Sequence, residues 1–229
     1  MASVKAPNPL DPAEIEVWIF DLDNTLYPAD CRLFEQVDRR IGLFIADFLK
    51  VEPTEARRIQ KQYFRDHGTT LSGLMAHHDV DPEAFLEYVH DIDMSPVKPS
   101  ESLPRLLGKL EGLKIIFTNG SAGHAERVMA RLGVSDHFDA VFDIAAANYV
   151  PKPRRETYRK LIDRHKIEPG SAVIIDDIAE NLLPAAELGM TTVWIRSDLA
   201  WAQPGESDDH IHLVADDLVS WLESVIERG

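Results

Sequence analysis

The 229-residue chain has a single cysteine, Cys31, so it cannot form an intrachain disulfide. This usage is typical of proteins from a reducing compartment. The sequence also lacks an uninterrupted apolar run near the roughly 18 residues that a membrane span requires. Its first residues contain no apolar segment of the signal-peptide kind. We therefore expect a cytoplasmic protein that does not associate with membranes.

Basic residues are scarce as well. The 24 lysines and arginines stand against 39 aspartates and glutamates, which gives a formal net charge of -15. A chain this acidic repels polyanions, so no nucleic-acid polymer is expected as a partner. If a ligand carries phosphate, local cations must overcome the overall negative field. The composition, 45% hydrophobic and 28% charged, is that of a globular protein, which we expect to be a monomer or a homodimer.

Short apolar segments alternate with helical patterns in the second half of the chain. Such alternation predicts an α/β fold, in which helices cover both faces of a parallel sheet. The predicted strands lie at 16–20, 113–117, 138–144, 171–175 and 191–195, with a short edge strand at 211–215.

A long helical region separates the first predicted strand from the others. In residues 30–50 apolar side chains recur every three or four positions, as one face of a helix requires. Three further helices are expected before residue 93. We predict a helical domain at 29–97, inserted into a sheet domain made of 15–28 and 98–229.

Two aspartates, Asp21 and Asp23, follow the first strand directly. If the strand continues, their side chains point to the same face. Two like charges about 4 Å apart repel by roughly 4 kcal/mol at an effective dielectric constant of 20. A cation, a proton or water must therefore offset this repulsion.

Polar groups also follow three of the other predicted strands. In open parallel sheets ligands bind beyond the carboxyl ends of the strands, so these groups are expected to meet at one edge. Clustered carboxylates suit Mg²⁺, and an Asn-Gly turn leaves backbone N–H groups free to hold an anion. Together with a lysine, they predict phosphoryl transfer. The groups are Thr118, Asn119 and Gly120 after 113–117, Lys152 between two prolines, and Asp176 and Asp177 after 171–175.

Each of these signals alone is most often a turn or a helix cap, and the prediction rests on their occurrence in order. The segments "DLDNTLY", "TNG", "PKP" and "IIDD" resemble the four motifs of the haloacid dehalogenase-like hydrolase superfamily. The resemblance extends from residue 16 onward. It implies a Rossmann-like catalytic core, with residues 29–97 as a helical type-1 cap. The segments "GTTLSGLM", "VHDID" and "IFTNGSAGHAERV" resemble the pyrimidine 5'-nucleotidase group within it.

The resemblance implies a role for each acidic residue. Asp21 is expected to be the nucleophile that forms an aspartyl-phosphate. Asp23 is expected to be the general acid and then the general base, with a proton that neighbouring carboxylates help it to hold. Magnesium is expected between Asp21, the backbone carbonyl of Asp23, and Asp176, with Asp177 as a ligand directly or through water.

The same resemblance assigns the phosphate contacts. Lys152 is expected to neutralise Asp21 and a phosphate oxygen, and Thr118 to donate a hydroxyl hydrogen bond. Backbone N–H groups near Leu22, Asn119 and Gly120 are expected to complete the phosphate site. Asn181 either braces the acidic loop or is an ordinary helix residue.

The implied function is a magnesium-dependent phosphatase of a small phosphorylated metabolite, most specifically a pyrimidine nucleoside 5'-monophosphate. Thr70 and Ser72 of the cap are candidate substrate contacts, or merely helix-capping residues. A phosphatase for a sugar phosphate or phosphoglycolate is the main alternative, and a catalytically silent regulatory protein is another. Asp23 argues against a carbon–halogen dehalogenase, because a halide leaving group needs no acid. The cap shows neither an obvious Schiff-base lysine nor an acid–base pair for a mutase.

Overall fold

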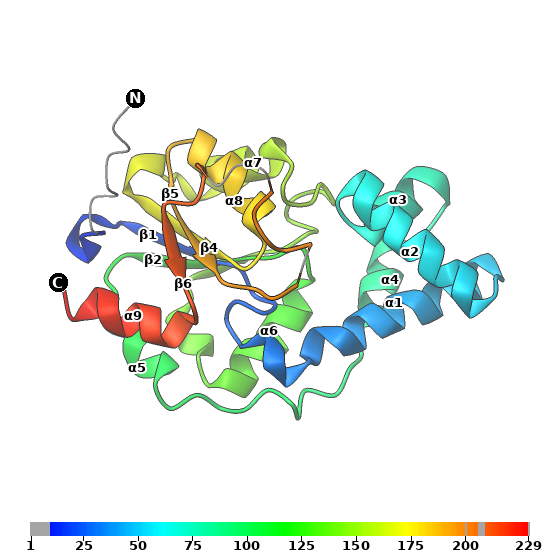
Figure 1. Cartoon of the computed structure of the whole chain (residues 1–229), viewed down its shortest axis with the longest axis horizontal. Coiled ribbons are helices and arrows are strands. Elements are labelled where there is room, and N and C mark those ends of the chain that lie inside the picture. Colours follow the sequence, from blue (N-terminus) through cyan, green and yellow to red (C-terminus); the bar gives the residue numbers. More distant parts are fainter. Residues whose placement is uncertain (1–9, 200, 206–208, 229) are drawn as a thin grey trace.

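A single parallel sheet forms the centre of the computed structural model, which describes residues 10–199, 201–205 and 209–228 (Figure 1). The sheet has six strands in the order β3-β2-β1-β4-β5-β6, and all neighbouring pairs are parallel. This confirms the predicted α/β class and Rossmann-like sheet. The strands are β1 (Val17–Phe20), β2 (Leu113–Phe117), β3 (Ala140–Phe142), β4 (Ala172–Asp176), β5 (Thr191–Ile195) and β6 (Leu213–Ala215).

Helices cover both faces of the sheet, because the strands are apolar on both sides. Along β1, Trp18 and Phe20 pack into one hydrophobic cluster, while Val17 and Ile19 pack into another on the opposite face. Figure 1 shows one group of helices below the sheet and a second group above it. The first group is α5 (Leu103–Leu107), α6 (Ala122–Leu132) and α9 (Leu218–Ile226), and the second is α7 (Arg155–His165) and α8 (Ala179–Glu187).

A helical insertion follows β1 and lies beside the carboxyl end of the sheet in Figure 1. Its helices share a core of their own, to which α1 contributes Val37 and Ile45 and α4 contributes Phe85 and Val89. We call these helices the helical insertion: α1 (Leu33–Leu49), α2 (Pro53–His67), α3 (Thr70–His77) and α4 (Pro82–His90).

Close packing fixes α3 against α2. A Cβ atom placed on Gly73 would lie 2.3 Å from the Cβ atom of Tyr63, so only glycine fits there without a shift.

Among the described residues, no helix is long and apolar enough to cross a membrane.

Candidate active site

The ends of β1 and β4 meet at the middle of the sheet. From this point the chain builds β2 and β3 on one side and β5 and β6 on the other, which leaves a crevice at the strand ends. Asp21 directly follows β1, and its backbone N–H donates to the carbonyl of Ile175 at 2.9 Å. Asp176 ends β4 and Asp177 follows it. The strand register therefore places these carboxylates at one edge.

Lys152 is buried at this edge, with an exposed fraction of 2%. Its Nζ lies 2.7 Å from Asp21 Oδ1, 2.7 Å from Asp176 Oδ2 and 3.0 Å from the carbonyl oxygen of Phe117. Burial alone would lower the pKa of the ammonium group. The adjacent carboxylates of Asp176 and Asp21 outweigh burial and raise that pKa above its ordinary value, so Lys152 is a cation.

The side chain of Asn119 fixes the loop that carries Lys152. Its Oδ1 accepts the backbone N–H of Lys152 at 2.8 Å, and its Nδ2 donates to the Lys152 carbonyl at 3.2 Å. The structure therefore uses the Asn119 side-chain amide to hold the lysine loop.

The acidic groups suit a divalent cation. Asp21, Asp176 and Asp177 each offer an oxygen within 4.8 Å of the others, and all three residues are buried. Among the described residues, Oδ2 of Asp177 is buried without a hydrogen-bond partner. Burial and the charge of Asp21 hold the pKa of Asp177 well above its ordinary value, a cost that a bound cation would offset.

Asn181 braces this acidic loop, although through Asp176 and not through the adjacent Asp177. Its Nδ2 lies 3.0 Å and 3.2 Å from the two carboxylate oxygens of Asp176. The backbone carbonyl of Asn181 in turn accepts the hydroxyl of Tyr158. Asp176 is thus held by both a lysine and an amide, so it is the most constrained of the acidic groups.

Asp23 lies in different surroundings. Its Oδ1 accepts hydrogen bonds from the Tyr27 hydroxyl at 2.6 Å and from His124 Nε2 at 2.8 Å. Burial raises the pKa of Asp23, but the charge and hydrogen bond of His124 outweigh it and lower the pKa to about 2. The expectation that neighbouring carboxylates keep a proton on Asp23 is therefore wrong. The groups that face it are hydrogen-bond donors, so Asp23 is ionised before substrate arrives.

The "TNG" turn lies beside these carboxylates. Thr118 is buried, and its Oγ1 accepts the backbone N–H of Gly120 at 2.9 Å. Thr118, Asn119 and Gly120 all line the same cavity as Asp21 and Asp23. The side chain of Leu22 is fully buried in the sheet's core, so only its backbone can serve a phosphate.

A cavity of about 1240 Å³ extends from these residues to the helical insertion. Proteins bind small molecules in cavities of roughly 300–1,000 Å³, so this one has room for more than a phosphate. Its wall on the insertion is largely apolar, with Phe34, Ile41 and Phe85 among the lining side chains. Thr70 also lines it, with its hydroxyl donating to the Gln60 carbonyl at 3.2 Å.

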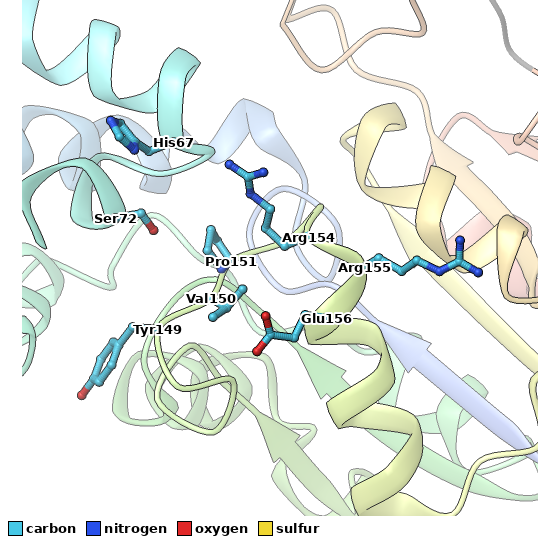
Figure 2. A pocket seen from close by; sticks show the side chains of 8 residues that line it. All are labelled: His67, Ser72, Tyr149, Val150, Pro151, Arg154, Arg155 and Glu156. Carbon is cyan, nitrogen blue, oxygen red and sulfur yellow. The ribbon is translucent and has the colours of Figure 1, made fainter. Parts of the chain in front are cut away.

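Ser72 lies elsewhere. It lines a separate, smaller hollow of about 430 Å³, together with His67, Pro151 and Arg154 (Figure 2). Its hydroxyl is 2.9 Å from that of Thr69, which begins α3 as its N-cap. The structure thus separates the two candidate substrate contacts, Thr70 inside the large cavity and Ser72 outside it.

The surroundings of Asp23 were not predicted from the sequence. Tyr27 lies four residues after Asp23 within the first motif, and His124 follows the "TNG" turn in the first turn of α6. His90, which ends α4, stacks on His124 with ring centroids 4.4 Å apart and an interplanar angle of 8°. The only sequence signal is the presence of a tyrosine and histidines near motif residues, which does not indicate what they contact.

A sequence model of the haloacid dehalogenase-like hydrolase family matches residues 15–189. The chain belongs to this family. Its membership confirms the superfamily predicted from the four motifs. In this haloacid dehalogenase-like hydrolase, the four motifs lie together at the carboxyl ends of the strands.

Two curated proteins are similar to this chain in sequence. Phosphate metabolism protein 8 of Saccharomyces cerevisiae is 30% identical over 208 residues, which are 81% of this chain and 62% of that protein. This chain therefore spans less than two thirds of that relative's length. Bifunctional epoxide hydrolase 2 of Rattus norvegicus is 33% identical over 63 residues, only 28% of this chain and 11% of that protein.

Solved structures share the fold of this haloacid dehalogenase-like hydrolase. A HAD phosphatase from Thermococcus onnurineus has a TM-score of 0.62 and 19% identity, covering 92% of this chain and 98% of that chain. An L-2-haloacid dehalogenase from Xanthobacter autotrophicus has a TM-score of 0.57 and 16% identity, covering 94% of this chain and 99% of that chain. At such identities the likeness concerns the fold alone.

Proposed function

We propose that this protein is a phosphatase that hydrolyses phosphate monoesters through an aspartyl-phosphate on Asp21. The observation that carries the proposal is the buried contact of Lys152 with Asp21 in a cavity that also contains Asp23. A carboxylate beside a fixed cation can receive a phosphoryl group, and a second carboxylate nearby can exchange protons with the leaving group and with water.

The reaction then has two steps. An oxygen of Asp21 attacks phosphorus, the bond from phosphorus to the ester oxygen breaks, and that oxygen takes a proton from Asp23. In the second step Asp23, now ionised, removes a proton from a water molecule, which attacks phosphorus and releases inorganic phosphate from Asp21. Asp23 is ionised at rest and acquires its proton as the anionic substrate arrives, because a nearby negative charge raises a carboxyl pKa.

Lys152 and the turn residues stabilise the charge that develops on the phosphoryl oxygens. The Lys152 ammonium group lies 2.7 Å from Asp21, so it is next to the phosphoryl group during its transfer to Asp21. Thr118 and the backbone N–H groups of Leu22 and Asn119 would supply donors from the other strand ends. The N–H group of Gly120 is already engaged by the Thr118 hydroxyl.

Magnesium fits the acidic groups, and we propose it as the cofactor. Asp21, Asp176 and Asp177 would hold it together with the backbone carbonyl of Asp23. When bound, the ion neutralises negative charge around the phosphoryl group.

Removal of the metal is expected to abolish phosphate release. The test uses p-nitrophenyl phosphate and protein dialysed against a chelator, with Mg²⁺ then added back. Activity should return with Mg²⁺ in the wild type but not at the same concentration in Asp177→Asn, which loses a carboxylate of the cluster. Full turnover by thoroughly chelated protein would exclude the proposed cofactor.

A dehalogenase is the second candidate, since L-2-haloacid dehalogenases share the fold. Asp23 favours the phosphatase, because an alkoxide needs a proton on leaving and a halide does not. A silent regulatory protein is disfavoured, because each residue assigned to the chemistry is present and in the cavity or directly beneath it.

We further propose that the preferred substrates are pyrimidine nucleoside 5'-monophosphates. The catalytic edge contacts only the phosphate, so selectivity must come from the helical insertion, which acts as the cap. Its apolar wall suits a planar base, and the "GTTLSGLM" and "VHDID" segments resemble the pyrimidine 5'-nucleotidase group. A site that pairs with one base edge leaves polar groups unpaired with the wrong base.

UMP or CMP is expected to be cleaved at least about tenfold more efficiently than AMP or GMP, a difference of about 1.4 kcal/mol in transition-state binding. Thr70→Val should reduce this ratio, because Thr70 lines the cavity. Ser72→Ala should leave the ratio unchanged, because Ser72 lines the other hollow. The measurement is kcat/KM on the four nucleotides. A preference for purine nucleotides, sugar phosphates or phosphoglycolate would contradict the substrate class and leave the chemistry standing.

A further inference from the structure

The two oxygens of Asp23 are held differently. Oδ1 accepts both described hydrogen bonds, from Tyr27 and from His124. Among the described residues, none donates a hydrogen bond to Oδ2. Because Asp23 lines the large cavity, the unclamped oxygen is the one available to a substrate. A carboxylate held by one oxygen in this way is fixed in rotation about its side-chain bonds.

His124 holds Asp23 without lining the cavity itself. Its side chain is fully buried and is not among the residues that line the cavity, so it does not touch a substrate there. Its Nε2 lies 2.8 Å from Oδ1 of Asp23, the oxygen that also accepts the Tyr27 hydroxyl, so the geometry assigns Nε2 as a donor to this oxygen. Nδ1 is buried without a hydrogen-bond partner among the described residues, so Asp23 is the side chain that His124 holds.

His90 connects this pair to the helical insertion. It is the last residue of α4, and its ring covers that of His124 at 4.4 Å and 8°. Its Nδ1 is 2.9 Å from the hydroxyl of Ser121, and its carbonyl oxygen accepts Nη2 of Arg127 at 2.8 Å. Ser121 and Arg127 belong to the start and body of α6, the helix that carries His124. The end of the insertion is thus fastened onto the residue that holds Asp23.

We propose that His124 is a positioning residue for Asp23, and that His90 makes this positioning depend on the seating of the helical insertion. The inference rests on the proposed phosphatase function. Its physical basis is that proton transfer requires the donor and acceptor oxygens to be aligned, so a carboxyl group free to rotate transfers its proton less often. When the insertion is displaced, His124 loses its covering ring and Asp23 loses a fixed orientation.

The first experiment compares two substitutions of His124. His124→Phe keeps a flat ring under His90 but removes the donor, and His124→Gln keeps an N–H group near the position of Nε2. Both are assayed on UMP, whose alkoxide needs a proton, and on p-nitrophenyl phosphate, whose phenolate does not. His137→Phe, on η3 (Ser135–His137) away from the cavity, is the matched control.

We expect His124→Phe to lower kcat/KM on UMP by about tenfold or more and kcat/KM on p-nitrophenyl phosphate by less than about threefold, because kcat/KM reports the first step and only UMP needs a proton there. His124→Gln should recover most of the loss on UMP. Equal losses on the two substrates, or no recovery in His124→Gln, would overturn the positioning role. If the wild type releases phosphate from neither ester, the proposed function itself fails, which is a distinct result.

The second experiment tests His90 and remains decisive if His124→Phe does not fold. His90→Phe keeps the stacked ring, whereas His90→Ala removes it. We expect His90→Ala to repeat the selective loss on UMP, and His90→Phe to retain most of the activity. A rise in KM on both substrates would instead mean that His90 acts by touching the substrate from the cavity wall. That result, or wild-type kcat/KM values on both substrates in His90→Ala, would refute the coupling to the insertion.

Discussion

Asp21→Asn protein should form no phosphoryl-enzyme and lose activity on every phosphate ester. Asparagine has nearly the shape of aspartate and can still accept the hydrogen bond of Lys152, so the fold should be kept. Its amide is a poor nucleophile. We expect kcat/KM to fall by about 1000-fold or more, equivalent to about 4 kcal/mol of transition-state stabilisation.

Asp23→Asn is the companion variant for this experiment. With p-nitrophenyl phosphate the first step needs no proton, so the phosphoryl group should still reach Asp21 but leave it slowly. Acid quenching followed by mass spectrometry of the peptide that contains residue 21 measures both variants. A phosphorylated peptide from Asp21→Asn would place the nucleophile elsewhere. Equal losses of kcat/KM on UMP and on p-nitrophenyl phosphate would argue against the acid role of Asp23.

Lys152→Met should lose at least about 100-fold in kcat/KM, equivalent to about 2.7 kcal/mol. The methionine has a similar length but leaves Asp21 and Asp176 without the cation between them. Removing one partner from a buried ion pair typically costs about 3–5 kcal/mol, so the free energy of unfolding should fall in chelated protein. Added Mg²⁺ should recover part of this stability, but not the activity.

Lys166→Met is the control, because it removes the positive charge of a lysine outside the site. Lys166 is exposed just beyond the end of α7, so its loss should change neither turnover nor denaturant unfolding appreciably. Steady-state kinetics and urea unfolding of the two variants, with and without Mg²⁺, make the comparison. Near-wild-type kcat/KM in Lys152→Met would remove the lysine from the proposed chemistry.

The sheet and the meeting of its strand ends could be predicted from the sequence because both follow from short-range patterns. The apolar runs before Asp21 and Asp176 mark buried strands, and parallel strands deliver their carboxyl ends to one edge. Helix α5 was not predicted, since its five residues are too few to show a helical period. Strand β3 is shorter than the predicted 138–144, and pairs only through Ala140–Phe142.

The pKa of Asp23 could not be predicted, because it depends on side chains that are distant in the sequence. His124 is 101 residues from Asp23, and only the packing of α6 against the end of β1 brings them together. Local sequence pointed to Asp21 as the charged neighbour, whereas the structure turns Asp23 toward Tyr27 and His124. In the same way the sequence placed Thr70 and Ser72 together, although residues two positions apart in a helix point to nearly opposite sides and these two face different hollows.

The apolar wall of the large cavity is made of the helical insertion's own core. Phe85, Leu86 and Val89 of α4 belong to the hydrophobic cluster that holds α1–α4 together, and they also line the cavity. A substitution that reshapes this wall for another substrate therefore also removes or overfills packing between the helices. If this wall sets substrate selectivity, as we propose, then a substitution that changes selectivity also changes the stability of the helical insertion, and a lineage that acquires a new substrate must repack these helices.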